Sequence, residues 1–545
     1  MTAPNTQNAD SGSTTTSRTL SVASSAKSNK QQHESGAGGE DDTGTMQTNA
    51  LRPDEKEGVV NGKDPLIVDW DVDDPENPKD WSLWYKIFVT GQLGMLALAA
   101  SMGSSIISPA TNTIAEVAGV GEVTAVLALS LYVLGFAFGP LLWAPISEVW
   151  GRRISLLPPM YVLGIFSIGT AVSSTPAAIF ITRFFGGVFA SAPVSNVSAA
   201  LGDIYSQAAR GTAVTFYALM VVGGPTLGPV IGSAILVNPH MGWRWTEYIE
   251  AIWAFTVAIF STIFLPELYG PVLLKRKAQK LRKETGNSEL YHPHERIKLD
   301  FKSIVTKQLS RPLLMLFTEP AVTCIALYAS FVYGLLYLTL EVYPIVYSEG
   351  RHWSPVVSSL PFISLFIGVN MAVAINLGNQ PRYIRILKAN GGKAVPEARL
   401  PPLAIGAFLF AIGLFWFGWT AGPTIPWPAS VCAGIFIGAG FNAIFQQCIN
   451  FLIDTYTIYA ASAVSANTFL RSILAAALPL VARPMFHNLG VGPAMSILGG
   501  IATLAIPVPF LFMRYGKALR KKSKFAPFDE GEDNKSKGKG KKEEV

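Results

Sequence analysis

Twelve apolar blocks follow one another along the chain between residues 86 and 513. They lie at residues 86–107, 123–146, 154–173, 177–201, 211–236, 243–266, 313–347, 355–378, 402–420, 427–452, 459–482 and 491–513. A helix of about 20 apolar residues crosses a bilayer, and in hydrocarbon the backbone must bond to itself as a helix. The pattern predicts an all-α integral membrane protein with twelve transmembrane helices in two six-helix bundles. The block 313–347 is too long for one perpendicular span, so we expect its outer end to lie in the membrane interface.

The polar segments between the blocks predict the domain organisation. Residues 1–82 are rich in Ser, Thr, Gly and acids, which is typical of a disordered tail. We expect an N-terminal bundle over 83–266, a cytoplasmic central loop over 267–311, a C-terminal bundle over 312–513 and a basic C-terminal tail over 514–545. A short match between Asp203-x-Tyr205-Ser206 and Asp454-x-Tyr456-Thr457, at equivalent places in the two halves, indicates a duplication of six helices. Paired halves around a central site are the architecture of secondary transporters.

Lys and Arg concentrate on one side of the predicted helices. They follow the even-numbered blocks, for example as Arg210, Lys277, Arg382 and Arg399, whereas the opposite loops hold only Arg244, Arg351 and Arg483. Short cytoplasmic loops carry an excess of these residues, so both termini and the central loop are expected in the cytoplasm. We expect a multi-pass protein of the cell (plasma) membrane, with the vacuolar membrane as the alternative.

Composition narrows the function. The chain is 50% hydrophobic and 15% charged, compared with about 25% charged residues in soluble proteins. The three cysteines form no short motif, so neither a disulfide framework nor a zinc site is indicated. The phosphate loop GxxxxGK[ST] and the enzyme motifs HExxH and GxSxG are absent. We expect no enzyme activity, no metal, no cofactor beyond a proton gradient as the energy source, and no nucleic acid. The expected partners are the bilayer and a small-molecule substrate, with the chain acting as a monomer.

The loop after the second block carries a charge cluster in the sequence SEVWGRR. Gly151 allows a tight turn, Arg152 and Arg153 supply fixed cations, and Glu148 stands at a helix end. Such a cluster can latch the two halves on one side and release them when its pairing changes. The alternative is a simple anchor of positive charge beside the inner leaflet.

Glycines recur every four residues in the fifth block, at Gly224, Gly228 and Gly232, with Pro225 and Pro229 between them. The stripe lets a neighbouring backbone approach closely, and the prolines remove backbone donors and bend the helix. We interpret it as a packing seam, as a place where the halves hinge, or as both.

Ionisable residues at membrane depth are functional hypotheses by default. We expect a proton and charge relay of three acids with two arginines as counter-charges: Glu247, Glu250, Glu341, Arg183 and Arg471. A desolvated glutamate has a raised pKa, which suits the loading and release of a proton. Asp203 and Asp454 lie at cytoplasmic helix ends, where an interfacial role is expected.

Polar and aromatic side chains predict a substrate cavity. Asn442, Gln446 and Asn450 are spaced by four residues, so they form a polar stripe on an otherwise apolar helix. Tyr333 and Tyr337 in the seventh block could stack on a flat or cationic ligand. Packing and interfacial roles are the alternative for each tyrosine.

Several segments resemble the major facilitator superfamily, and within it the fungal twelve-helix drug:proton antiporter family. APISEVWGRR is similar to its loop 2–3 signature, TRFFGGVFASAP to its helix 4 signature with Arg183 as the arginine, and GGPTLGPVIG to the antiporter signature of helix 5. DDPENPKDWS, GWRWTEY and NTFLRSILAAALPL resemble the branch that contains polyamine and multidrug exporters. Glu148 stands where many members have Asp, and Glu250 has no place in the family pattern. The match covers roughly residues 70–515.

The resemblance implies a secondary active transporter. We expect proton-coupled efflux of a small organic compound, such as a drug, toxin or secondary metabolite, by alternating access. A polyamine exporter and a nutrient uptake carrier or proton symporter are the alternatives. A receptor or scaffold would need a folded tail, which the sequence does not indicate.

Overall fold

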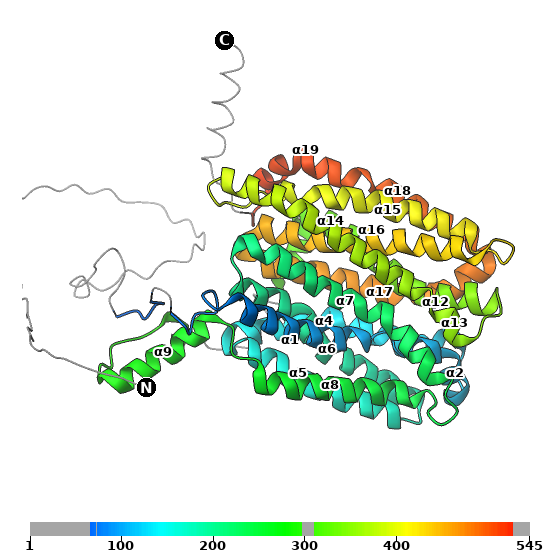
Figure 1. Ribbon diagram of the computed structural model, residues 1–545, viewed down its shortest axis with the longest axis horizontal. Helices are drawn as coiled ribbons and strands as arrows, with labels where there is room; N and C mark the ends of the chain where they lie inside the picture. Colours follow the sequence, from blue (N-terminus) through cyan, green and yellow to red (C-terminus); the bar gives the residue numbers. More distant parts are fainter. Residues whose placement is uncertain (1–65, 72–73, 297–309, 527–545) are drawn as a thin grey trace, which may run out of the picture. The chain divides into compact units, whose positions relative to one another are not determined.

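In the computed structural model, which describes residues 66–71, 74–296 and 310–526, helices run back and forth between two ends of the protein (Figure 1). We call the end that holds α9 (Gly270–Thr285) the inner end and the end that holds α2 (Thr111–Ala118) and α13 (Pro355–Ser359) the outer end. Within the described residues, twelve helices are long and apolar enough to cross a membrane, and each corresponds to one predicted block. The predicted all-α membrane fold is confirmed.

Six spans form the N-terminal half. They are α1 (Leu83–Met102), α3 (Glu122–Ala125) continued by α4 (Leu127–Trp150), α5 (Arg152–Val172), α6 (Pro176–Ile204), α7 (Gln207–Leu236) and α8 (Arg244–Phe264). Within this half, α6 packs on α4 and α5, α8 on α5, and α7 on α1.

Six further spans form the C-terminal half. They are α12 (Pro320–Tyr343) with the π-helical turn Pro344–Glu349, α13 with α14 (Phe362–Ala389), the 3-10 turn Pro396–Arg399 with α15 (Leu400–Thr420), α16 (Trp427–Tyr456), α17 (Ala460–Leu489), and α18 (Val491–Ala505) with α19 (Pro507–Lys522). The two halves meet along two seams, where α4 packs on α17 and α7 packs on α14.

The long seventh block ends differently from the prediction. Pro320 has no backbone N–H and begins α12, so the preceding residues form a separate helix, α11 (Ser310–Thr318), at the inner end. On α11 the apolar Leu314 and Phe317 are exposed. At the outer end Tyr347 is fully buried. Part of the extra length of this block therefore forms a separate helix at the inner end, and the expected interfacial position of the outer end stays a prediction.

The segments outside the bundles also make contacts at the inner end. Residues 66–71 and 74–82, which we expected in a disordered tail, lie beside α9 and the loop after it. The Val68 N–H donates to Tyr291 O at 3.0 Å. Lys277 of α9 pairs with Asp71 and Asp74 at 2.6 Å each. The hydrogen bond from Lys277 holds the pKa of Asp74 below its usual range. The rest of the predicted N-terminal tail, residues 1–65, and residues 527–545 of the predicted C-terminal tail lie outside the described residues.

The glycine stripe of α7 faces α1. A Cβ added at Gly224 would lie 2.5 Å from the Met102 backbone nitrogen, and one added at Gly228 would lie 3.0 Å from the Ile106 nitrogen. Ser105 Oγ also donates to Gly224 O at 3.3 Å. The predicted packing seam is present, but it joins two helices of the N-terminal half, so the described contacts do not place a hinge between the halves there.

Replacing Gly224 by alanine should destabilise the protein, because the added methyl group meets backbone atoms that cannot rotate away. Overpacking of this kind costs about 1–3 kcal/mol. The measurement is the midpoint of thermal unfolding in detergent. Gly378→Ala on α14 is the matched control, since a Cβ there meets nothing within 4 Å, and a midpoint for Gly224→Ala equal to that control would contradict the close packing.

Candidate functional site

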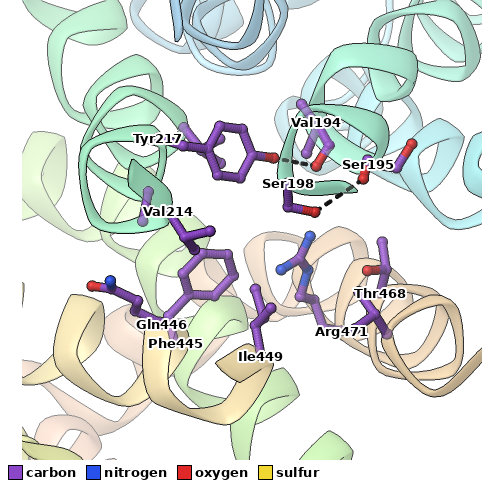
Figure 2. Close-up of a pocket in the computed structure, with 13 residues that line it drawn as sticks. Val194, Ser195, Ser198, Val214, Tyr217, Phe445, Gln446, Ile449, Thr468 and Arg471 are labelled. Carbon is purple, nitrogen blue, oxygen red and sulfur yellow. Dashed lines mark hydrogen bonds between the residues drawn. The ribbon is translucent and has the colours of Figure 1, made fainter. Parts of the chain in front are cut away.

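Two connected cavities lie between the halves. The inner cavity, of about 320 Å³, is lined by residues of α4, α6 and α7 on one side and of α16, α17 and the turn between them on the other. The central cavity, of about 20 Å³, lies deeper and is lined by residues of α6, α7, α16 and α17 (Figure 2). Ser195, Ser198, Val464 and Thr468 line both cavities. The two cavities therefore adjoin each other, and we call them together the path, which extends from the inner end to the middle of the protein.

Arg471 lies at the deep end of this path. Figure 2 shows its guanidinium directed from α17 toward Ser198 and Tyr217 on the opposite half. The guanidinium carbon lies 4.6 Å from the ring centre of Tyr333 and 4.8 Å from that of Phe445, and the side chain is almost fully buried. The described structure gives Arg471 no hydrogen bond or ion pair, and its Nε and Nη1 atoms are buried without partners. In this conformation, no acid of the described structure pairs with Arg471 as the sequence analysis expected.

Arg183 and the two glutamates of α8 form a buried cluster in the N-terminal half. Arg183 pairs with Glu247 at 3.1 Å and donates to Gly103 O at 2.7 Å and to Ala128 O at 2.8 Å. Its guanidinium lies 4.3 Å from the ring centre of Tyr132. The expected pairing of Arg183 with an acid is present.

Glu250 belongs to the same cluster but has no partner in the described structure. Both of its carboxylate oxygens are buried without a hydrogen bond. The carboxylate lies against the end of α1, since a Cβ added at Gly103 would be 2.6 Å from Glu250 Oε1. The cluster therefore holds two carboxyl groups and one guanidinium, and Glu247 takes the guanidinium.

Glu341 belongs to a different group at the outer end. It accepts from Arg483 Nε at 3.2 Å. Arg483 also pairs with Glu122 at 2.5 Å and donates to Asn112 Oδ1 at 3.0 Å, and both of these residues lie in the N-terminal half. Glu349 lies 3.8 Å from Arg483 and accepts from His487 at 2.9 Å. We call Arg483, Glu122, Asn112, Glu341 and Glu349 the outer cluster. The five residues of the predicted relay therefore lie at three separate places.

Of the predicted polar stripe, Gln446 lines the central cavity. Its amide contacts Thr215 on α7 and Asn376 on α14, so it joins the halves. Asn442 donates to Val369 O at 3.2 Å, within the C-terminal half. Asn450 is buried and lines neither cavity. Only Gln446 is therefore placed to contact a substrate in this conformation.

The two predicted tyrosines lie behind the cavity rather than in its lining. Tyr333 stacks on Phe445 with ring centres 5.6 Å apart and supports Arg471 from behind. Tyr337 shares a hydrogen bond of 2.8 Å with Ser104 of the N-terminal half. Both are fully buried, so their contacts are with the protein itself.

The charge cluster after the second span is held by Glu267, which the sequence did not single out. The Glu267 carboxylate accepts the backbone N–H groups of Arg152 and Arg153 at the start of α5, at 2.7 and 3.2 Å. Gly151 precedes them with φ of 101°, and a Cβ there would lie 2.6 Å from Glu267 Cδ. Glycine is therefore required on two counts, the backbone angle and the space.

The cations of this cluster bind within their own half. The Arg152 side chain pairs with Asp203 of α6 at 2.8 Å, and Arg153 donates to Thr262 O of α8. Glu148 lines the inner cavity. The predicted latch between the halves is therefore not made by Arg152 or Arg153 in this conformation.

The C-terminal half contains a matching pair, and the acid of that pair also binds the N-terminal half. Arg399, just before α15, pairs with Asp454 near the end of α16 at 2.9 Å, as Arg152 at the start of α5 pairs with Asp203 near the end of α6. Asp454 also pairs with Arg210 of the N-terminal half at 3.3 Å, and Gln380 donates to Ala208 O at 2.7 Å. The repeated Asp–Arg pairs agree with the predicted duplication.

Three arginines in these charged contacts had no specific role in the sequence analysis. Arg210 and Arg399 were used only as markers of the cytoplasmic side, and Arg483 was an exception on the opposite side. The available signal was the Asp454 match itself, because a duplicated acid implies a duplicated cation. In the described residues, no group of three or more His, Cys, Asp and Glu side chains is placed to hold a metal ion.

Comparisons with known proteins agree with this architecture. The profile of the Major Facilitator Superfamily matches residues 93–479. The multidrug transporter FLU1 of Candida albicans is 40% identical over 471 residues, which span 86% of this chain and 77% of that protein. The efflux pump bik6 of Gibberella fujikuroi is 41% identical over 464 residues, spanning 84% of this chain and 95% of that protein.

Solved structures support the fold independently. The xylose transporter XylE from E. coli, in a partially occluded inward-open conformation, aligns with a TM-score of 0.56 at 18% identity. The alignment covers 79% of this chain and 99% of XylE. With twelve spans in two halves, a cavity between them and these relatives, the chain is a multi-pass membrane transporter and belongs to the Major Facilitator Superfamily.

Proposed function

We propose that the chain exports a small organic compound from the cytoplasm in exchange for protons. The observation that carries the proposal is the path between the halves, which leads from the inner end to Arg471 while charged contacts of the outer cluster join the halves beyond it. A path of this form can load cargo on one side and release it on the other when the halves rock. The names of the relatives, a multidrug transporter and an efflux pump, support export.

Charged contacts join the halves at both ends in this conformation, and each set would break in turn during transport. At the outer end Arg483 reaches Glu122 and Asn112, and at the inner end Arg210 reaches Asp454. Glu122 is 59% exposed at its side chain, and ion pairs with an exposed partner contribute about 0–1 kcal/mol. Contacts of this strength hold one conformation and still break at low cost.

The Arg183, Glu247 and Glu250 cluster is our candidate for proton coupling. One guanidinium neutralises one of two buried carboxyl groups, and an isolated buried charge costs several kcal/mol. We therefore assign the transported proton to Glu250 and the structural counter-charge role to Glu247. The exchange of one proton then changes the charge of the cluster by one unit.

The charge pattern supports our proposal for the orientation of the chain. The basic residues of α9 and of the end of α19 lie at the inner end, which the positive-inside rule assigns to the cytoplasm. We propose the plasma membrane as the location, with both termini cytoplasmic, a monomer as the working unit and no cofactor beyond the proton gradient. Uptake by proton symport is the alternative that the same fold accommodates.

Direction and coupling can be tested in inside-out vesicles from cells that express the chain. Two xanthene dyes of opposite charge, fluorescein and rhodamine 6G, serve as probes. With an acidified lumen, we expect the vesicles to accumulate at least one of the dyes above vesicles without the chain. Collapse of the pH gradient should abolish the accumulation, and accumulation that survives the collapse would contradict proton coupling.

Glu250→Gln should uncouple transport. The amide keeps the size of the side chain and leaves the Arg183–Glu247 pair in place, so we expect normal abundance and downhill dye movement. Accumulation driven by the pH gradient should fall at least about tenfold, which corresponds to about 1.4 kcal/mol. Accumulation at the wild-type level would remove Glu250 from the coupling step.

Glu247→Gln is the matched comparison. It removes the carboxylate that pairs with Arg183, and breaking a buried ion pair costs about 3–5 kcal/mol. We expect a lower thermal midpoint in detergent and lower abundance in the membrane. Equal stability of the Glu247→Gln and Glu250→Gln proteins would contradict the separate roles.

Glu122→Gln should favour opening of the outer end, since it removes one charged contact between the halves. A cysteine introduced at Ser104, which is fully buried beside Tyr337, reports this opening in a protein without its three native cysteines. If the lost contact stabilises the closed outer end by about 0.5–1 kcal/mol, its removal raises the open population about two- to fivefold. We expect labelling by an impermeant maleimide from outside to rise by about the same factor. Glu116→Gln is the control, since Glu116 is an exposed residue of α2, and an equal effect of the two substitutions would contradict the gate.

A further inference from the structure

Arg471 differs from the other buried arginines in what surrounds it. Arg183, Arg399 and Arg483 each pair with a carboxylate. The described structure gives Arg471 two aromatic rings and no anion, although the side chain is almost fully buried. The difference needs a physical explanation, because Arg471 stands in the transport path.

The rings do not balance the charge. A cation over aromatic rings gains about 0.5–2 kcal/mol, whereas an uncompensated buried ion costs several kcal/mol even after relaxation. A guanidinium also keeps its proton under all physiological conditions. Arg471 is therefore a buried cation whose charge no anion of the described structure compensates.

The geometry fits an anion that arrives through the cavity. Tyr333 and Phe445 lie over the guanidinium, which leaves its N–H groups free to form hydrogen bonds in the plane, as in a bidentate carboxylate pair. None of the thirteen residues that line the central cavity is an acid, and Ser198, Thr468 and Gln446 supply polar groups there. A cavity that holds one water needs about 10–15 Å³, so the 20 Å³ around Arg471 accepts only a small group in this conformation. The body of a cargo would occupy the adjoining inner cavity.

We propose that Arg471 is the docking site for the negatively charged group of the cargo, so that the exporter takes organic acids, with a carboxylate as the preferred group. The inference rests on the proposed function, since it requires that cargo passes through these cavities. A polyamine would instead place an ammonium group beside the guanidinium, and like charges at this distance repel. Tyr333 and Phe445, whose rings contact the guanidinium, act as positioning residues for it.

The test compares the charge preference of transport with and without the guanidinium. Initial rates of fluorescein and rhodamine 6G uptake are measured in inside-out vesicles with an acidified lumen, and the dyes are quantified after filtration and lysis at a fixed pH. The two dyes share a fused-ring body, but fluorescein carries a carboxylate and rhodamine 6G is a cationic ester. We expect the wild-type protein to prefer fluorescein and Arg471→Gln to lose at least about tenfold of the fluorescein rate, equivalent to about 1.4 kcal/mol, without losing rhodamine 6G transport.

Two variants separate the charge from the packing. Arg471→Lys keeps the positive charge but lacks the planar guanidinium that donates two parallel hydrogen bonds to a carboxylate. It should therefore retain fluorescein transport at a reduced rate. Ser472→Ala removes a buried hydroxyl from the next position of α17 and should leave the dye preference unchanged. Abundance and the thermal midpoint in detergent report folding for each variant.

The outcomes distinguish this proposal from the proposed function. If the wild-type protein prefers rhodamine 6G, or if Arg471→Gln transports fluorescein at the wild-type rate or loses both dyes equally, the anion site is overturned and efflux remains. If the wild-type protein moves neither dye, the efflux function itself is contradicted.

Discussion

A charge that is buried in a membrane protein must find a partner, and this constraint organises the interior of the chain. Water is absent from the hydrocarbon region, so unpaired ions and unbonded polar groups cost far more than they do at a soluble surface. Arg183 meets the requirement with Glu247 and two backbone carbonyls. Arg399 meets it with Asp454, and Arg483 with Glu341. Each pairing fixes several helices relative to one another.

The same constraint identifies the groups that are left over. Glu250 and Arg471 are buried as deeply as the paired residues, yet the described structure gives neither a hydrogen bond. A carboxyl group can satisfy the constraint by taking a proton, whereas a guanidinium cannot lose one. The two unpaired residues therefore lead to different proposals, a proton site for Glu250 and an anion site for Arg471.

Close packing holds helices together within a half, whereas charged contacts join the two halves. Inside the N-terminal half, the glycines of α7 bring its backbone against α1, a contact that resists sliding. Between the halves, the charged contacts lie at the two ends, at Arg483 and at Arg210, and the hydrogen bonds of Gln446 and Tyr337 lie between them. Rigid halves joined by weak terminal contacts are suited to rocking about a central site.

The sequence by itself determined the number and the approximate positions of the twelve spans, because an apolar stretch of hydrocarbon length is a local property of each block. It also determined the duplication, through the Asp203 and Asp454 match, and it placed Arg183, Glu247 and Glu250 at membrane depth. The distribution of partners was decided only by the tertiary structure. Arg483 lies 142 positions from Glu341 in the chain, and Arg210 lies 244 positions from Asp454, so no spacing rule connects them. The sequence grouped Arg471 and Glu341 with the N-terminal acids because all are ionisable residues in apolar helices. Only the packing of the helices showed that they serve three different places, since a side chain's partner is set by which helix faces it.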